Sequence, residues 1–93
     1  MLSQILTVEE VADYLKLLGF EVEHDDELYV VSASPTCKAE VARIWSEDIG
    51  VGLYLYDSAI TLLDTLSKCY TVTSCMESRY FYDITNSNSR RSN

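Results

Sequence analysis

Acidic side chains are the residues of this sequence whose type and spacing most directly suggest chemistry. They gather on one short stretch of chain and on the segment before it: Glu21, Glu23, Asp25, Asp26 and Glu27, preceded by Glu9, Glu10 and Asp13. Carboxylates in such a run commonly only face water and keep a small protein soluble. They can also imitate nucleic-acid phosphates and occupy the basic groove of a DNA- or RNA-handling protein. The spacing leaves both interpretations open.

Metal binding and catalysis find little support in the residue pattern. The run Asp25-Asp26-Glu27 lacks the alternating acids and the central glycine of a calcium loop. The chain has a single histidine, His24, and three cysteines that lie apart in the sequence: Cys37, Cys69 and Cys75. This spacing does not favour zinc, and a Cys–His nucleophilic pair has neither a local signature nor an orienting third group. We expect no metal, no other cofactor and no enzymatic activity.

Tyrosine is the second enriched residue type, with seven copies in 93 residues. Tyr54 and Tyr56 alternate with leucines, and Tyr80 and Tyr82 flank Phe81. Tyrosines on an outward strand face suit protein interfaces, because each combines a large rigid contact area with a hydrogen-bonding tip. Ordinary cross-strand packing is the alternative. We take Tyr54, Tyr56, Tyr80 and Tyr82 as candidate partner contacts that face outward, and we place Tyr54 and Tyr56 in one interface with the acidic residues.

Length and charge limit the classes of function. A chain of 93 residues with a formal charge of −8 predicts one acidic domain, either monomeric or homodimeric. Direct nucleic-acid binding is disfavoured, because it depends on Lys and Arg, whereas basic protein surfaces are favoured. The longest apolar runs are far shorter than the roughly 20 residues of a membrane span, and the N-terminus does not resemble a signal peptide. We therefore expect a cytoplasmic protein with reduced cysteines, in the host cytoplasm if it is viral.

The first elements expected from the pattern are a helix and a hairpin. Thr7 and Glu10 form a capping box, apolar residues repeat at helical spacing, and Gly19 follows as a C-cap, which predicts a helix over Val8–Leu18. Phe20–Glu23 and Leu28–Ala33 then predict a β-hairpin with one acidic face.

The remaining elements are expected to alternate between helix and strand. Ser34-Pro35 has the form of a helix start, and the apolar spacing after it predicts a second helix over Pro35–Glu47. We expect the rest in this order: a strand over Val51–Tyr56, a helix from Asp57-Ser58 to about Tyr70, a hairpin of Tyr70–Cys75 with Arg79–Thr85, and a disordered polar tail over 86–93. The order αββαβαββ predicts an α+β domain over residues 1–85, with a largely antiparallel sheet and helices on one face.

Residues 6–44 resemble the opening of B5-type domains, which occur in the β subunit of phenylalanyl-tRNA synthetase. The similarity rests on Leu6–Glu23, with its helix ending in Leu-Gly-Phe-Glu-Val, on Leu28–Val31, and on Ser34-Pro35 followed by Glu40–Ile44. It covers under half of the chain. Thr36-Cys37 stands where that family carries an aromatic residue and an arginine, and the segment before Glu40 is shorter. The resemblance implies the local helix and hairpin, and we transfer no functional residue from it.

Size, charge and the absence of a catalytic motif together favour a non-enzymatic regulator. We expect an acidic inhibitor that uses the helix and hairpin carboxylates to block a basic surface of a nucleic-acid-binding protein. Phage-encoded inhibitors of host defence, anti-CRISPR proteins among them, combine these features. The alternative is a small adaptor that uses a Tyr-lined strand for homo- or hetero-oligomerisation, with the acidic face merely solvated.

Overall fold

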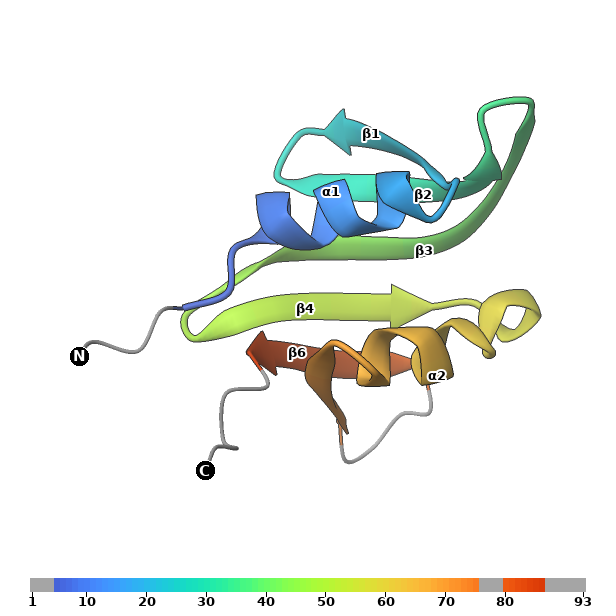
Figure 1. Ribbon diagram of the computed structural model, residues 1–93. Coiled ribbons are helices and arrows are strands. Elements are labelled where there is room, and N and C mark those ends of the chain that lie inside the picture. The colour runs from blue at the N-terminus through green and yellow to red at the C-terminus, as the bar shows by residue number, and fades with distance from the viewer. Residues whose placement is uncertain (1–4, 76–79, 87–93) are drawn as a thin grey trace.

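The computed structural model describes residues 5–75 and 80–86, which form one six-stranded antiparallel sheet and two α-helices (Figure 1). The elements follow the chain as α1 (Val8–Leu17), β1 (Glu21–Asp25), β2 (Leu28–Ser34), β3 (Cys37–Glu47), β4 (Gly50–Leu55), a 3₁₀ turn η1 (Asp57–Ala59), α2 (Leu62–Ser67), β5 (Tyr70–Ser74) and β6 (Phe81–Asn86). The α+β class is confirmed. The strands outnumber those expected, because a predicted helix is a strand.

The sheet has the strand order β1-β2-β3-β4-β6-β5, and both helices lie on the same side of it (Figure 1). Side chains alternate between the two faces along each strand. We call the side covered by α1 and α2 the helix face and the opposite side the open face. The last strand of the chain, β6, is an interior strand, and β1 and β5 form the two edges.

The hydrophobic core lies between the helix face and the two helices. Val31, Ala42 and Leu55 are cross-strand neighbours on that face, and none is more than 1% exposed. Helix α1 contributes four buried residues and α2 two: Val8, Val11, Ala12, Leu15, Leu62 and Leu66. This apolar burial fixes which side of each strand faces inward, and therefore which residues remain on the open face.

Helix α1 and the hairpin after it form as the sequence predicts. The backbone N–H of Glu10 donates to the Thr7 hydroxyl (3.2 Å), and the Thr7 N–H donates to the Glu10 carboxylate (2.9 Å), completing the capping box. Gly19 ends the helix with a φ of 103°, a conformation that favours glycine. Strands β1 and β2 then pair through a two-residue turn at Asp26-Glu27, where Asp26 has a φ of 61°.

The predicted second helix over Pro35–Glu47 is wrong, because this segment is a turn followed by strand β3. Pro35-Thr36 connects β2 to β3, and the Ser34 hydroxyl accepts the Cys37 N–H at 3.0 Å. The capping hydroxyl therefore closes a turn instead of starting a helix. Strand β3 pairs with β2 on one side and β4 on the other, and these backbone hydrogen bonds, with the burial of Ile44, outweigh a helix-start pattern.

The third predicted helix is shorter than expected, whereas the last hairpin is confirmed. The segment after β4 contains η1 and then α2, and Tyr70 is the first residue of β5. Strands β5 and β6 pair antiparallel within the chain, and β6 also pairs with β4. Asn86, the first residue of the expected tail, ends β6, and the rest of that tail lies outside the described residues, as does the predicted turn at 76–78.

Neither helix in the described part of the chain is long and apolar enough to cross a lipid bilayer.

Candidate interaction surface

The acidic residues expected to form one surface are divided between the two sides of the sheet. Glu21, Glu23 and Asp25 share one side of β1, and the register pairs Glu23 with Val30 on the open face. Glu9 and Asp13 are exposed on α1, which covers the opposite side. Asp26 and Glu27 are exposed at the turn between β1 and β2. The helix and hairpin carboxylates therefore do not combine into a single flat docking surface.

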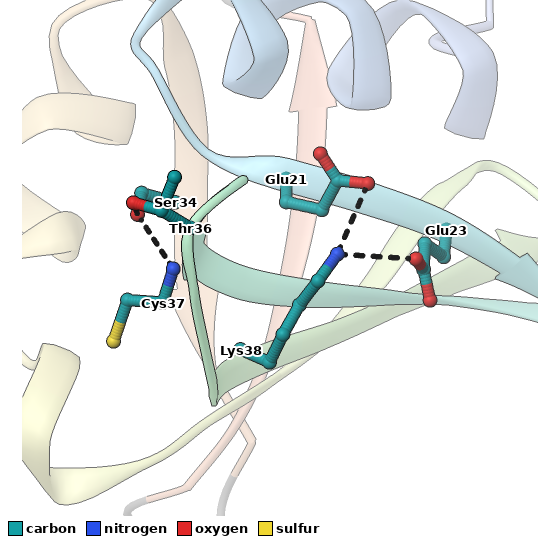
Figure 2. A network of polar contacts seen from close by, with 6 residues as sticks. All are labelled: Glu21, Glu23, Ser34, Thr36, Cys37 and Lys38. Carbon is teal, nitrogen blue, oxygen red and sulfur yellow. Dashed lines mark hydrogen bonds and ion pairs between the residues drawn. The ribbon is translucent and has the colours of Figure 1, made fainter.

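Two hairpin carboxylates are paired within the chain. The Lys38 ammonium lies 3.6 Å from a Glu21 carboxylate oxygen and 3.4 Å from one of Glu23, as Figure 2 shows. Lys38 comes from β3, whose start runs along β2 beside β1, so the contact joins non-adjacent strands. On α1, Glu10 serves the capping box. Of the eight predicted acidic contacts, three thus have structural partners.

The open face carries a continuous group of aromatic rings over β3, β4 and β6. Tyr54 is its centre, with ring centroids 5.1 Å from Tyr56, 4.9 Å from Phe81 and 6.0 Å from Tyr80. Trp45 continues the group, 6.3 Å from Phe81. We call these five residues the aromatic patch. Three of the four tyrosines predicted as contacts, Tyr54, Tyr56 and Tyr80, belong to it. Four of its members line a shallow pocket together with Arg43.

Strand register explains why the aromatic patch forms. Glu23, Val30, Arg43, Tyr54 and Phe81 are successive cross-strand neighbours, so they form one row across the open face. Among the described residues no helix covers this row, because α1 and α2 both pack on the other side. Phe81 consequently remains 41% exposed although it is a large apolar side chain.

A polar network orders the Tyr56 end of the aromatic patch. The Arg43 guanidinium donates to both carboxylate oxygens of Glu40, and the Tyr56 hydroxyl donates to the same carboxylate at 2.8 Å. These hydrogen bonds, led by that from Arg43, hold the pKa of Glu40 below its ordinary value. Donation to Glu40 also raises the pKa of Tyr56. Glu40 is therefore ionised at neutral pH, and its charge is balanced by Arg43.

Sequence reasoning missed three residues of the aromatic patch or its surroundings: Arg43, Trp45 and Phe81. The first two were assigned to a helix, which hid their alternation with the buried Ala42 and Ile44. Tyr82, in contrast, was expected to face outward, but it pairs with Leu53 on the helix face and is only 8% exposed. Period-two alternation over 42–45 and 81–84 was the available signal.

The cysteines and His24 do not come together as a catalytic or metal-binding group in the described residues. Cys37 and Cys69 are exposed, Cys75 is half-buried, and all three are free thiols. The Cys69 thiol donates to the Tyr14 hydroxyl at 3.3 Å, and His24 packs against the Tyr29 ring. Within 5–75 and 80–86, no three side chains among His, Cys, Asp and Glu are arranged to hold a metal ion.

Comparisons of this chain with protein-family models, with curated proteins and with solved structures give no match. The resemblance of residues 6–44 to B5-type domains therefore stays a prediction.

Proposed function

We propose that this chain is a non-enzymatic protein-binding module that regulates its partner by covering a basic surface with the open face of its sheet. One observation carries the proposal: the contiguous, partly exposed rings of the aromatic patch on a face that α1 and α2 leave uncovered. Aromatic residues anchor protein interfaces, since they combine large rigid area with polar tips. A sheet face of this composition is well suited to bind another protein.

Charge selects the kind of partner. Carboxylates surround the aromatic patch on the open face, and the only bases there among the described residues, Lys38 and Arg43, are paired with them. The whole chain carries a formal charge of −8. A basic partner surface is therefore electrostatically complementary, and nucleic-acid-binding proteins present such surfaces. A small phage-encoded inhibitor of a defence complex would act in this way.

The adaptor alternative uses the same tyrosines but a different partner. Strand β4 pairs on both sides, with β3 and β6, so Tyr54 and Tyr56 contact a partner through side chains and not through strand pairing. An adaptor of this kind would bind a partner without a basic surface, and its complex would resist salt. Salt dependence therefore separates the two functions.

The test is affinity capture with the chain as bait, from a nuclease-treated lysate of its native host, washed over a salt series. Two variants are compared with the original: Tyr54→Ala with Phe81→Ala removes rings from the open face, and Glu9→Gln with Asp13→Asn removes acids from the helix side. We expect a nucleic-acid-binding protein to be captured by the original and the helix variant, released by salt, and lost from the ring variant while circular dichroism shows an intact fold.

Three results would contradict this function. Capture that survives the ring variant but fails with the helix variant would move the interface to α1. A salt-resistant partner without a basic surface would favour the adaptor. If purified nucleic acid fails to compete with the captured protein for this chain, the covered surface is not the nucleic-acid site.

A further inference from the structure

Trp45 lies on the open face with its indole ring over its cross-strand neighbour Gly52. A methyl group added at Gly52, its cross-strand neighbour on β4, would overlap three atoms of the indole ring, so the ring covers the Gly52 backbone. The indole N–H donates to a Glu47 carboxylate oxygen at 2.9 Å. Packing on Gly52 and the hydrogen bond to Glu47 fix the position of the ring. Trp45 as a whole is only half-buried.

Two carboxylates border the ring. Glu47 is exposed at its edge, and Asp83 on β6 is the cross-strand neighbour of Gly52, in the same row as Trp45. Both carboxylates are close enough to Cys75 to add to the effect of burial, which raises the pKa of that thiol. Among the described residues, neither Glu47 nor Asp83 contacts a basic side chain.

The other end of the aromatic patch is different, because it contains its own cation. Arg43 lies two residues before Trp45 on β3, faces the same side and is held by Glu40. The charges of Arg43 and Glu40 therefore compensate each other at that end. Within residues 5–75 and 80–86, the Trp45 end has an aromatic ring and two carboxylates without a basic partner, which is the complement of a planar cation.

We propose that the Trp45 end of the open face binds an arginine side chain of the partner, with the guanidinium stacked on the indole ring and hydrogen-bonded to Glu47 and Asp83. This inference rests on the function proposed above. Arginine fits better than lysine, because its planar guanidinium stacks on an aromatic ring while its N–H groups remain directed at carboxylates in the ring plane.

The test uses the fact that Trp45 is the only tryptophan of the chain, so its signals report on this site alone. Acetylated hexaarginine amide is titrated into the ¹⁵N-labelled protein, and the indole N–H resonance and tryptophan fluorescence are followed. Hexalysine of the same charge is the matched probe. We expect saturable changes at Trp45, with hexaarginine binding about three- to fivefold more tightly than hexalysine, the scale of one exposed cation–π contact.

Matched charge variants separate this site from general attraction to an acidic protein. Glu47→Gln and Asp83→Asn each remove one charge, and glutamine at 47 still offers an oxygen to the indole N–H. Asp64→Asn removes one charge from α2 on the helix side, where Asp64 is exposed. We expect Glu47→Gln and Asp83→Asn each to weaken hexaarginine binding about threefold or more. Asp64→Asn should change hexaarginine binding less than twofold.

Equal weakening by all three variants, or equal affinity for the two peptides, would refute the arginine site. That failure is distinct from failure of the proposed function. If Trp45 does not respond while partner capture still needs Tyr54 and Phe81, only the arginine site is lost. If capture of the partner does not depend on Tyr54 and Phe81, the proposed function fails, whatever the result of the peptide titrations.

Discussion

At the scale of single residues, Gly52 is a position on the open face where the indole ring of Trp45 leaves no room for a side chain. Trp45 covers it, so Gly52→Ala must displace the indole ring. We expect the substitution to lower the free energy of unfolding by about 1–3 kcal/mol, as overpacking does. Tryptophan fluorescence should shift at the same time, because the ring loses its place against the sheet. Denaturant unfolding and emission spectra of the two proteins check this.

The Trp45→Ala background provides the control for Gly52→Ala. With the ring removed, alanine at position 52 meets no obstacle from Trp45, and alanine in a strand is favoured over glycine by about 0.5–1 kcal/mol. The same substitution should then be neutral or stabilising. A loss of stability of equal size in both backgrounds would mean that Gly52 is required for another reason.

At the scale of elements, the substitution Ile44→Ala tests the burial of β3 against the helices. Ile44 is completely buried between the sheet and the helices, and its truncation should cost about 2–5 kcal/mol of unfolding free energy. Ile49, in the turn after β3, is 74% exposed, and the chemically identical Ile49→Ala should change stability by about 0.5 kcal/mol or less. Urea denaturation of both variants measures the difference; similar losses would contradict the burial of β3.

Strand β3 also shows why part of the fold was not predictable from sequence. Between the pairs Val31–Ala42 and Ser32–Glu40, β3 advances two residues while β2 advances one, so Val41 is an extra residue in a β-bulge. The bulge makes Val41 and Ala42 both buried and breaks the period of two. Burial at 41, 42 and 44 imitates a helical spacing, and Ser34-Pro35 before it imitates a helix start. The segment is a strand only because it pairs with β2 and β4, and this pairing is not visible in its local sequence.

The candidate site was predictable within elements but not between them. Alternation correctly gave β1 one acidic face and placed Tyr54 and Tyr56 together, since both patterns are local. Which side of the sheet receives α1 depends on tertiary packing, so the sequence could not show that Glu9 and Asp13 lie opposite Glu21 and Glu23. The misassigned β3 hid Trp45 and Arg43 for the same reason.

At the scale of the whole molecule, an open sheet leaves two edges whose backbone groups can pair with another chain. The edges differ in charge: β1 carries Glu21, Glu23 and Asp25, whereas β5 has no charged residue over Tyr70–Ser74. Two β1 edges brought together would place carboxylates near one another, which is unfavourable. We therefore expect the acidic edge to oppose sheet-to-sheet association at β1.

Removing charge from β1 should consequently promote self-association. The triple variant Glu21→Gln, Glu23→Gln and Asp25→Asn is compared with Glu9→Gln, Asp13→Asn and Asp64→Asn, which changes the net charge equally but leaves both edges intact. Relief of like-charge pairs worth about 1 kcal/mol in total should let the β1 variant associate at roughly tenfold lower protein concentration. Sedimentation velocity over a concentration series measures this. If the triple variant Glu9→Gln, Asp13→Asn and Asp64→Asn associates to the same degree, net charge and not the position of the carboxylates keeps the chains apart.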